Sequence, residues 1–234
     1  SGNCYRAALM LNLIGADWQP AFVDFFGKGL PRTPEWRAEV NEMGEVPVLD
    51  HKGKRLTQSG VILTYLSDLT GKFKPQGEDE KLEALRWIIF DNQKLNGYLG
   101  PYRFLRNFAK PAGDPAAMAF LKARIDNSLG ILERRLARSP FLLGDRPTIA
   151  DISLVGYLYY PAEEFGFDMA GTHPNIATWL ARMWQPEAVQ HAIQGQPLWL
   201  QTLEIVCIAD LAQYWIHRAF HQISAIIKNF SGYT

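Results

Sequence analysis

Two stretches, residues 44–50 (GEVPVLD) and residues 55–66 (RLTQSGVILTYL), decide how this chain folds. The run VPVL is short and apolar and follows a glycine, a pattern typical of a buried strand. Pro47 lacks a backbone donor, so it suits the start of such a strand. The polar residues that follow include Gly53 and predict a hairpin turn, and Leu56 begins a second short strand.

The second stretch continues into a predicted helix. Ser59 is a typical N-cap, because its hydroxyl can accept a hydrogen bond from the first helical turn. Apolar residues then recur at helical spacing, namely Val61, Ile62, Tyr65 and Leu66. Strand, hairpin and helix thus follow one another within about two dozen residues.

Composition describes an ordinary globular protein. The chain has 234 residues, of which 47% are hydrophobic and 21% charged, enough for one large or two small domains. Lys plus Arg and Asp plus Glu balance at 24 each, so charge gives no reason to expect a nucleic-acid partner. The two cysteines, Cys4 and Cys207, are far apart, and no secretory signal is visible. A reducing, cytoplasmic location is therefore expected.

The residues before this stretch predict a small α/β unit. A helical pattern over the first 14 residues stops at Gly15, and residues 18–26 alternate as a strand would. Thr33 and Pro34 then predict the start of a short helix. Ser1 falls inside what looks like a motif, so we expect a leading strand to be missing. With that strand added, the unit is a thioredoxin-like α/β domain over residues 1–74.

From residue 78 onward the pattern is helical throughout, after a polar linker at residues 74–77. Asp114 predicts a helix start, and Thr148 with Asp151 predicts a capping box. A further helix is expected after His173. The first long helix is expected to bury an apolar face made of Leu82, Leu85, Trp87, Ile88, Ile89 and Phe90. The prediction is an all-helical domain over residues 78–197.

This order of elements resembles the cytosolic glutathione S-transferase family, in its bacterial type. The family pattern is a V-P-x-L strand, a hairpin, an acidic or amide residue followed by Ser, and a helix ending in Y-L. A second motif, L-x-G-x-x-x-T-x-A-D, matches residues 142–151. The resemblance covers residues 1 to about 197. It implies a cis Val46–Pro47 bond, glutathione as co-substrate, no metal, and a homodimer formed through the first helices of each domain.

The resemblance also implies which residues bind glutathione, and this set consists of Asn3, Val46, Pro47, Gln58 and Ser59. The backbone of Val46 would pair with the cysteinyl part like an added strand. Ser59 and the N–H groups of its helix would hold the γ-glutamyl carboxylate. Many relatives have Glu where this chain has Gln58, so the head group would be held by hydrogen bonds without a charge and glutathione affinity would be lower.

Two residues compete for the catalytic position. The thiolate is the reactive form of glutathione, and a donor to the sulfur or a helix N-terminus can stabilise it. By resemblance, Ser1 occupies the hydroxyl position of the serine-type members, and Cys4 lies close to the cysteine of the cysteine-type members. Serine would donate a hydrogen bond to the sulfur, whereas cysteine would form a mixed disulfide. For the small-molecule electrophile we expect a site near Tyr102, Arg103 and Arg106, which lie near helical spacing.

Residues 198–234 do not resemble the end of a transferase. Asp210, His217 and His221 resemble the first histidine box of the membrane fatty acid hydroxylase and sterol desaturase family. Such a family needs further histidine boxes, which do not follow, and Glu204 and Asp210 interrupt the apolar run. We expect an appended apolar helical tail with no metal site, and we do not expect it to contact a membrane.

Three functions follow from these patterns. The first is a glutathione transferase that conjugates the thiol to a small electrophile or uses it for thiol exchange. The second is a non-catalytic, transferase-like binding protein. The third is a fusion fragment that carries part of a membrane hydroxylase.

Overall fold

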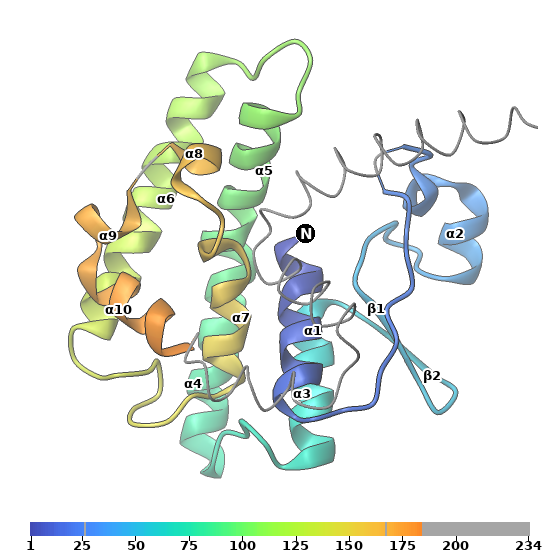
Figure 1. Cartoon of the computed structure of the whole chain (residues 1–234), viewed down its shortest axis with the longest axis horizontal. Coiled ribbons are helices and arrows are strands. Elements are labelled where there is room, and N and C mark those ends of the chain that lie inside the picture. The colour runs from blue at the N-terminus through green and yellow to red at the C-terminus, as the bar shows by residue number, and fades with distance from the viewer. Residues whose placement is uncertain (26, 167, 184–234) are drawn as a thin grey trace, which may run out of the picture.

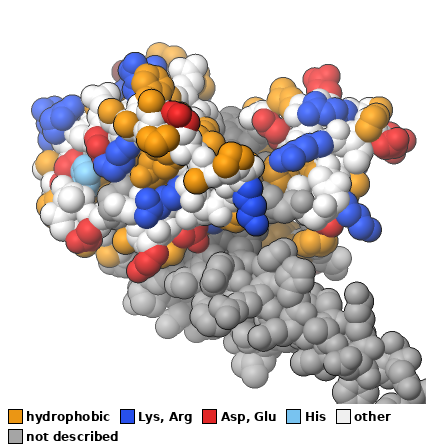
Figure 2. All heavy atoms as spheres, turned by 90° about the horizontal axis from the view of Figure 1, so that it is seen from above, with side chains coloured by type: hydrophobic (Ala, Val, Ile, Leu, Met, Phe, Trp, Pro, Cys, Tyr) orange, Lys and Arg blue, Asp and Glu red, His pale blue; other side chains and the backbone are white. Residues whose placement is uncertain are grey.

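The computed structural model describes residues 1–25, 27–166 and 168–183. A hairpin and a short helix form one side of the molecule, and long helices form the other (Figure 1). Seen from above, Lys and Arg side chains are interspersed with Asp and Glu side chains (Figure 2). The tail at residues 198–234, with His217 and His221, and the predicted end of the helical domain at residues 184–197 lie outside the described residues.

The N-terminal part contains helices and a hairpin in the predicted order. Its elements are α1 (Gly2–Leu13), η1 (Leu30–Arg32), α2 (Pro34–Glu39), β1 (Val48–His51), β2 (Lys54–Thr57) and α3 (Ser59–Thr70). Thr33 caps α2 as expected, since its side chain accepts a hydrogen bond from the Trp36 N–H. The two strands pair antiparallel, with Val48 opposite Thr57 and His51 opposite Lys54.

The hairpin has a two-residue turn with positive φ at Lys52 (49°) and Gly53 (77°). Such a turn matches the right-handed twist of the two strands. The predicted strand at residues 18–26 is wrong, because residues 18–25 form no strand. An extended segment becomes a strand only by pairing, and in the described part of the chain the sheet consists of β1 and β2 alone.

The C-terminal part is helical, and residues 77–136 contain no strand. Its elements are α4 (Gly77–Phe90), the π-helical turn η2 (Asp91–Leu95), α5 (Asn96–Asn107), α6 (Pro115–Leu136), α7 (Ile149–Leu158), α8 (Ala162–Phe165), α9 (Met169–Thr172) and α10 (Pro174–Met183). Two predicted caps are confirmed: Asp114 accepts from the N–H groups of Ala116 and Ala117, and Thr148 forms a capping box with Asp151. No described helix meets the length and hydropathy needed to cross a membrane.

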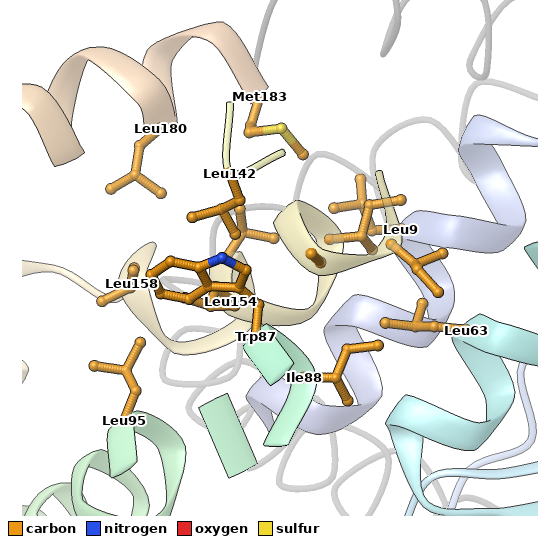
Figure 3. Packing of buried hydrophobic residues seen from close by; sticks show 14 of the residues in the cluster. Leu9, Leu63, Trp87, Ile88, Leu95, Leu142, Leu154, Leu158, Leu180 and Met183 are labelled. Atoms are coloured by element: carbon orange, nitrogen blue, oxygen red, sulfur yellow. The ribbon is translucent and has the colours of Figure 1, made fainter. Parts of the chain in front are cut away.

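One core joins the two parts, because α1 packs against both α3 and α7. Figure 3 shows the Trp87 ring of α4 among Leu142, Leu154 and Leu158. The predicted apolar face of α4 is only partly buried, since Trp87 and Ile88 are in the core whereas Leu82, Leu85 and Ile89 are exposed. The apolar residues of α4 are spread around the helix, so a helix buried on every side would be needed to cover them all. The neighbours of α4 cover only one side of it.

Candidate functional site

A polar pocket lies where four segments of the chain meet. Its lining residues are Asn3, Asn41, Glu45, Val46, Pro47, Gln58, Ser59 and Asn92. They come from the start of α1, the loop before β1, the start of α3 and the π-helical turn η2. All five residues predicted to bind glutathione are among them. The sequence analysis missed Asn41, Glu45 and Asn92, and only Glu45, which precedes the Val-Pro pair, carried a local signal.

The Val46–Pro47 peptide bond is cis, as predicted. The first strand begins two residues after Val46. Among the described residues, no hydrogen bond involves the backbone of Val46. Its N–H and C=O can therefore pair with an extended peptide ligand.

The loop before β1 is held by Asn41, which is buried. Its side-chain amide donates to the Glu45 carbonyl (2.9 Å), and its carbonyl oxygen accepts from the Met43 N–H (3.1 Å). Gly44 has a φ of 67°, and a Cβ there would lie 2.7 Å from the carbonyl oxygen of Pro31. Only glycine fits that position without a shift. The loop thus fixes the backbone from which Glu45 and Val46 reach the pocket.

Ser59 is the first residue of α3, and Gln58 takes the N-cap position without a side-chain capping bond. The prediction that Ser59 is the N-cap is wrong by one residue. Gln58 has φ 64° and ψ 116°, an unusual conformation for a residue with a side chain. Its amide donates to a carboxylate oxygen of Glu45 (3.1 Å). Backbone strain of this kind gathers at ligand sites, where it fixes the direction of a side chain.

Gln58→Gly is expected to raise the free energy of unfolding by about 1 kcal/mol, because glycine adopts positive φ without strain. It should also weaken ligand binding, because the side-chain amide is removed. Urea unfolding and calorimetric titration with glutathione measure the two effects. Lys52→Gly is the matched control, since Lys52 also has positive φ but lies in the hairpin turn, outside the pocket. The prediction fails if both variants change binding alike.

The start of α1 borders the pocket through Asn3, whose side-chain oxygen accepts from Asn96 (2.7 Å). Ser1 precedes α1 with no side-chain capping bond. Burial raises the pKa of Tyr157, and a hydrogen bond with the Ser1 side chain opposes that rise. Cys4 is half-buried in the first turn of α1. Ser1 and Cys4 therefore flank the residue that lines the pocket, but neither lines it.

A buried ion pair connects α1 to η2, the two elements that carry Asn3 and Asn92. Arg6 of α1 pairs with Asp91 of η2, and the Ser153 hydroxyl donates to the same carboxylate (2.8 Å). Burial raises the pKa of Asp91, and the charge of Arg6 opposes that rise. Asn92, which lines the pocket, is the next residue along η2. The pair thus joins the helix that carries Asn3 to the turn that carries Asn92.

Two family models and a sequence relative point to the same protein family. Residues 1–68 match the glutathione S-transferase N-terminal domain, and residues 115–182 match the glutathione S-transferase C-terminal domain. Maleylacetoacetate isomerase from Rhizobium meliloti is 34% identical over 177 residues, which cover 73% of this chain and 81% of that protein. The chain belongs to the glutathione S-transferase family.

Other proteins are similar to this chain in sequence and in structure. Disulfide-bond oxidoreductase YfcG from Escherichia coli is 30% identical over 64% of this chain and 72% of that protein. A glutathione S-transferase from Pseudomonas fluorescens superposes with a TM-score of 0.70 at 33% identity, covering 78% of this chain and 89% of that one. The predicted architecture, a thioredoxin-like domain followed by a helical domain, is confirmed.

The residues predicted for an electrophile site lie apart from the pocket of this family member. Tyr102 is 7% exposed and belongs to the core. Arg103 pairs with Glu164, and its guanidinium carbon lies 3.8 Å from the centre of the Tyr160 ring. Arg106 lies against Gly166. None of the three lines the pocket, and their contact with an electrophile remains a prediction.

Proposed function

We propose that the chain is a glutathione-dependent enzyme, which activates the glutathione thiol for conjugation to a small electrophile or for thiol exchange. The observation that carries the proposal is the pocket that gathers Asn3, Val46, Gln58 and Ser59 from three separate segments. The two curated relatives described above are an isomerase and a disulfide-bond oxidoreductase, so the family uses one scaffold for different reactions.

The proposed arrangement follows from the chemistry of each group. The cysteinyl part of glutathione pairs with the backbone of Val46 as an added strand does. The γ-glutamyl carboxylate lies at the first turn of α3, where N–H groups without helical partners and the Ser59 hydroxyl can donate. The thiol then reaches the start of α1, whose positive end stabilises the thiolate.

Ser1 and Cys4 offer two mechanisms, and we favour Ser1. A hydroxyl that donates to the sulfur stabilises charge as the thiolate forms, and loss of one such donor lowers kcat by about 10²-fold. Cys4 would instead attack a disulfide through its own thiolate. Cys4 lies within α1, where its side chain is half-buried.

The test measures binding of glutathione to the full chain by calorimetry, then turnover with an aromatic halide and with a small disulfide. We expect Ser1→Ala to lower the rate of halide conjugation about 10²-fold and to leave glutathione affinity nearly unchanged. Cys4→Ala should have little effect on that rate. If Cys4→Ala abolishes disulfide turnover and Ser1→Ala is silent, the cysteine mechanism holds. Binding without any turnover would favour the alternative, a non-catalytic binding protein.

A homodimer remains part of the proposal, and of the two helices expected to form it we keep α4 and propose α3 in place of α1. Every residue of α1 is buried or half-buried, so α1 offers no exposed apolar face. Exposed apolar side chains lie instead on α3 and α4, namely Val61, Leu69, Leu82, Leu85 and Ile89. A second copy of the chain could cover them.

A further inference from the structure

Glu45 is the only charged residue among those that line the described pocket. The other lining residues are three asparagines, a glutamine, a serine, a valine and a proline. No Lys or Arg of the described residues forms an ion pair with Glu45. Within the described part of the chain, the pocket therefore presents one negative charge that lacks a cationic partner.

The position of this carboxylate is set by its neighbours. The Asn41 side-chain amide donates to the backbone carbonyl of Glu45, and the Gln58 amide donates to the Glu45 carboxylate. Gln58 immediately precedes Ser59 at the start of α3. The charge therefore lies on the side of the pocket where α3 begins, which is also where the γ-glutamyl head group lies in the proposed arrangement.

Glutathione carries two carboxylates and one ammonium. A carboxylate in the pocket attracts the ammonium and repels either carboxylate of the ligand. Gln58 is neutral, and its amide already donates to Glu45. Gln58 by itself therefore adds no charge with which to bind an ammonium.

We propose that Glu45 binds the free α-amino group of the γ-glutamyl residue and that Gln58 positions the Glu45 carboxylate for this contact. The inference rests on the proposed function, because it assumes that the pocket holds glutathione. It makes Glu45 the residue that selects thiols with a free amino group. It also replaces the expectation that a Gln at position 58 leaves the head group without a charged partner.

The experiment compares three ligands by calorimetry on the full chain: glutathione, N-acetylglutathione and the glycyl monoethyl ester of glutathione. Wild-type protein should bind glutathione more tightly than its N-acetyl form. In Glu45→Gln, the ratio of these two affinities should fall by about fivefold, the size of an exposed ion pair. Glu42→Gln is the matched control, because Glu42 is an exposed glutamate of the same loop that does not line the pocket. Its affinity ratio should equal that of the wild type.

Three results would overturn the inference. The first is an unchanged affinity ratio in Glu45→Gln. The second is tighter glutathione binding by Glu45→Gln together with a wild-type preference for the ester, which would place the glycyl carboxylate beside Glu45. Both leave the proposed function intact, since glutathione still binds. The third, wild-type protein that binds none of the three ligands, would overturn the proposed function as well.

Discussion

Asp91→Ala is expected to lower the free energy of unfolding by about 3–5 kcal/mol, because it leaves the charge of Arg6 buried and unpaired. Arg6 is 0% exposed and Asp91 is 1% exposed. Two guanidinium nitrogens of Arg6, Nε and Nη2, already have no hydrogen-bond partner among the described residues. Of the side chains that the structure describes, Ser153 alone would still be bonded to this guanidinium after the removal of Asp91.

Urea unfolding of the variant, followed by circular dichroism, measures the change. A double variant, Arg6→Met with Asp91→Leu, should recover most of the loss, because an apolar pair of similar size leaves no buried charge. Asp126→Ala is the control, since Asp126 pairs with Lys122 on the exposed face of α6 and its removal should cost less than about 1 kcal/mol. Equal losses in Asp91→Ala and Asp126→Ala would show that the Arg6–Asp91 pair does not stabilise the fold.

Much of the site could be predicted because its signals are local. The Val-Pro pair, the Gln-Ser pair and the caps at Thr33, Asp114 and Thr148 each depend on a few adjacent residues. Such motifs dictate their own backbone through hydrogen bonds within one turn. Four of the eight pocket residues, Val46, Pro47, Gln58 and Ser59, come from segments of this kind.

The rest could not be predicted, because it depends on contacts between distant segments. Asn92 reaches the pocket through a π-helical turn, and nothing in its neighbourhood distinguishes it from an asparagine on a helix surface. A charged side chain in a helix normally indicates exposure, but Arg6 is buried because it contacts Ser153 of α7 and Asp91 of η2. The alternating pattern of residues 18–25 predicts a strand, but no described strand pairs with them.

Asp151→Ala is the second substitution with a large expected effect, a loss of about 3 kcal/mol or more in the free energy of unfolding. Asp151 is 0% exposed, and its carboxylate accepts four hydrogen bonds. The donors are the Leu142 N–H (2.9 Å), the Thr148 N–H (2.9 Å), the Thr148 hydroxyl (3.2 Å) and the Trp179 indole N–H (3.0 Å). A buried donor that loses its acceptor costs about 1–3 kcal/mol, so several such losses add to a large effect.

These bonds join the first turn of α7 to the loop that precedes it and to α10, which lies further along the chain. Asp151→Asn keeps the size of the side chain and one carbonyl oxygen, so it should lose clearly less stability than Asp151→Ala. Asp114→Ala is the control, because Asp114 also caps a helix with two N–H groups but is exposed, and its loss should cost about 1 kcal/mol. If Asp151→Ala costs no more than Asp114→Ala, Asp151 is only a helix cap. A larger loss, with the tryptophan fluorescence of the still-folded variant changed in a Trp179-containing chain but not in a Trp179→Phe background, would show that the carboxylate also fixes α10 against α7.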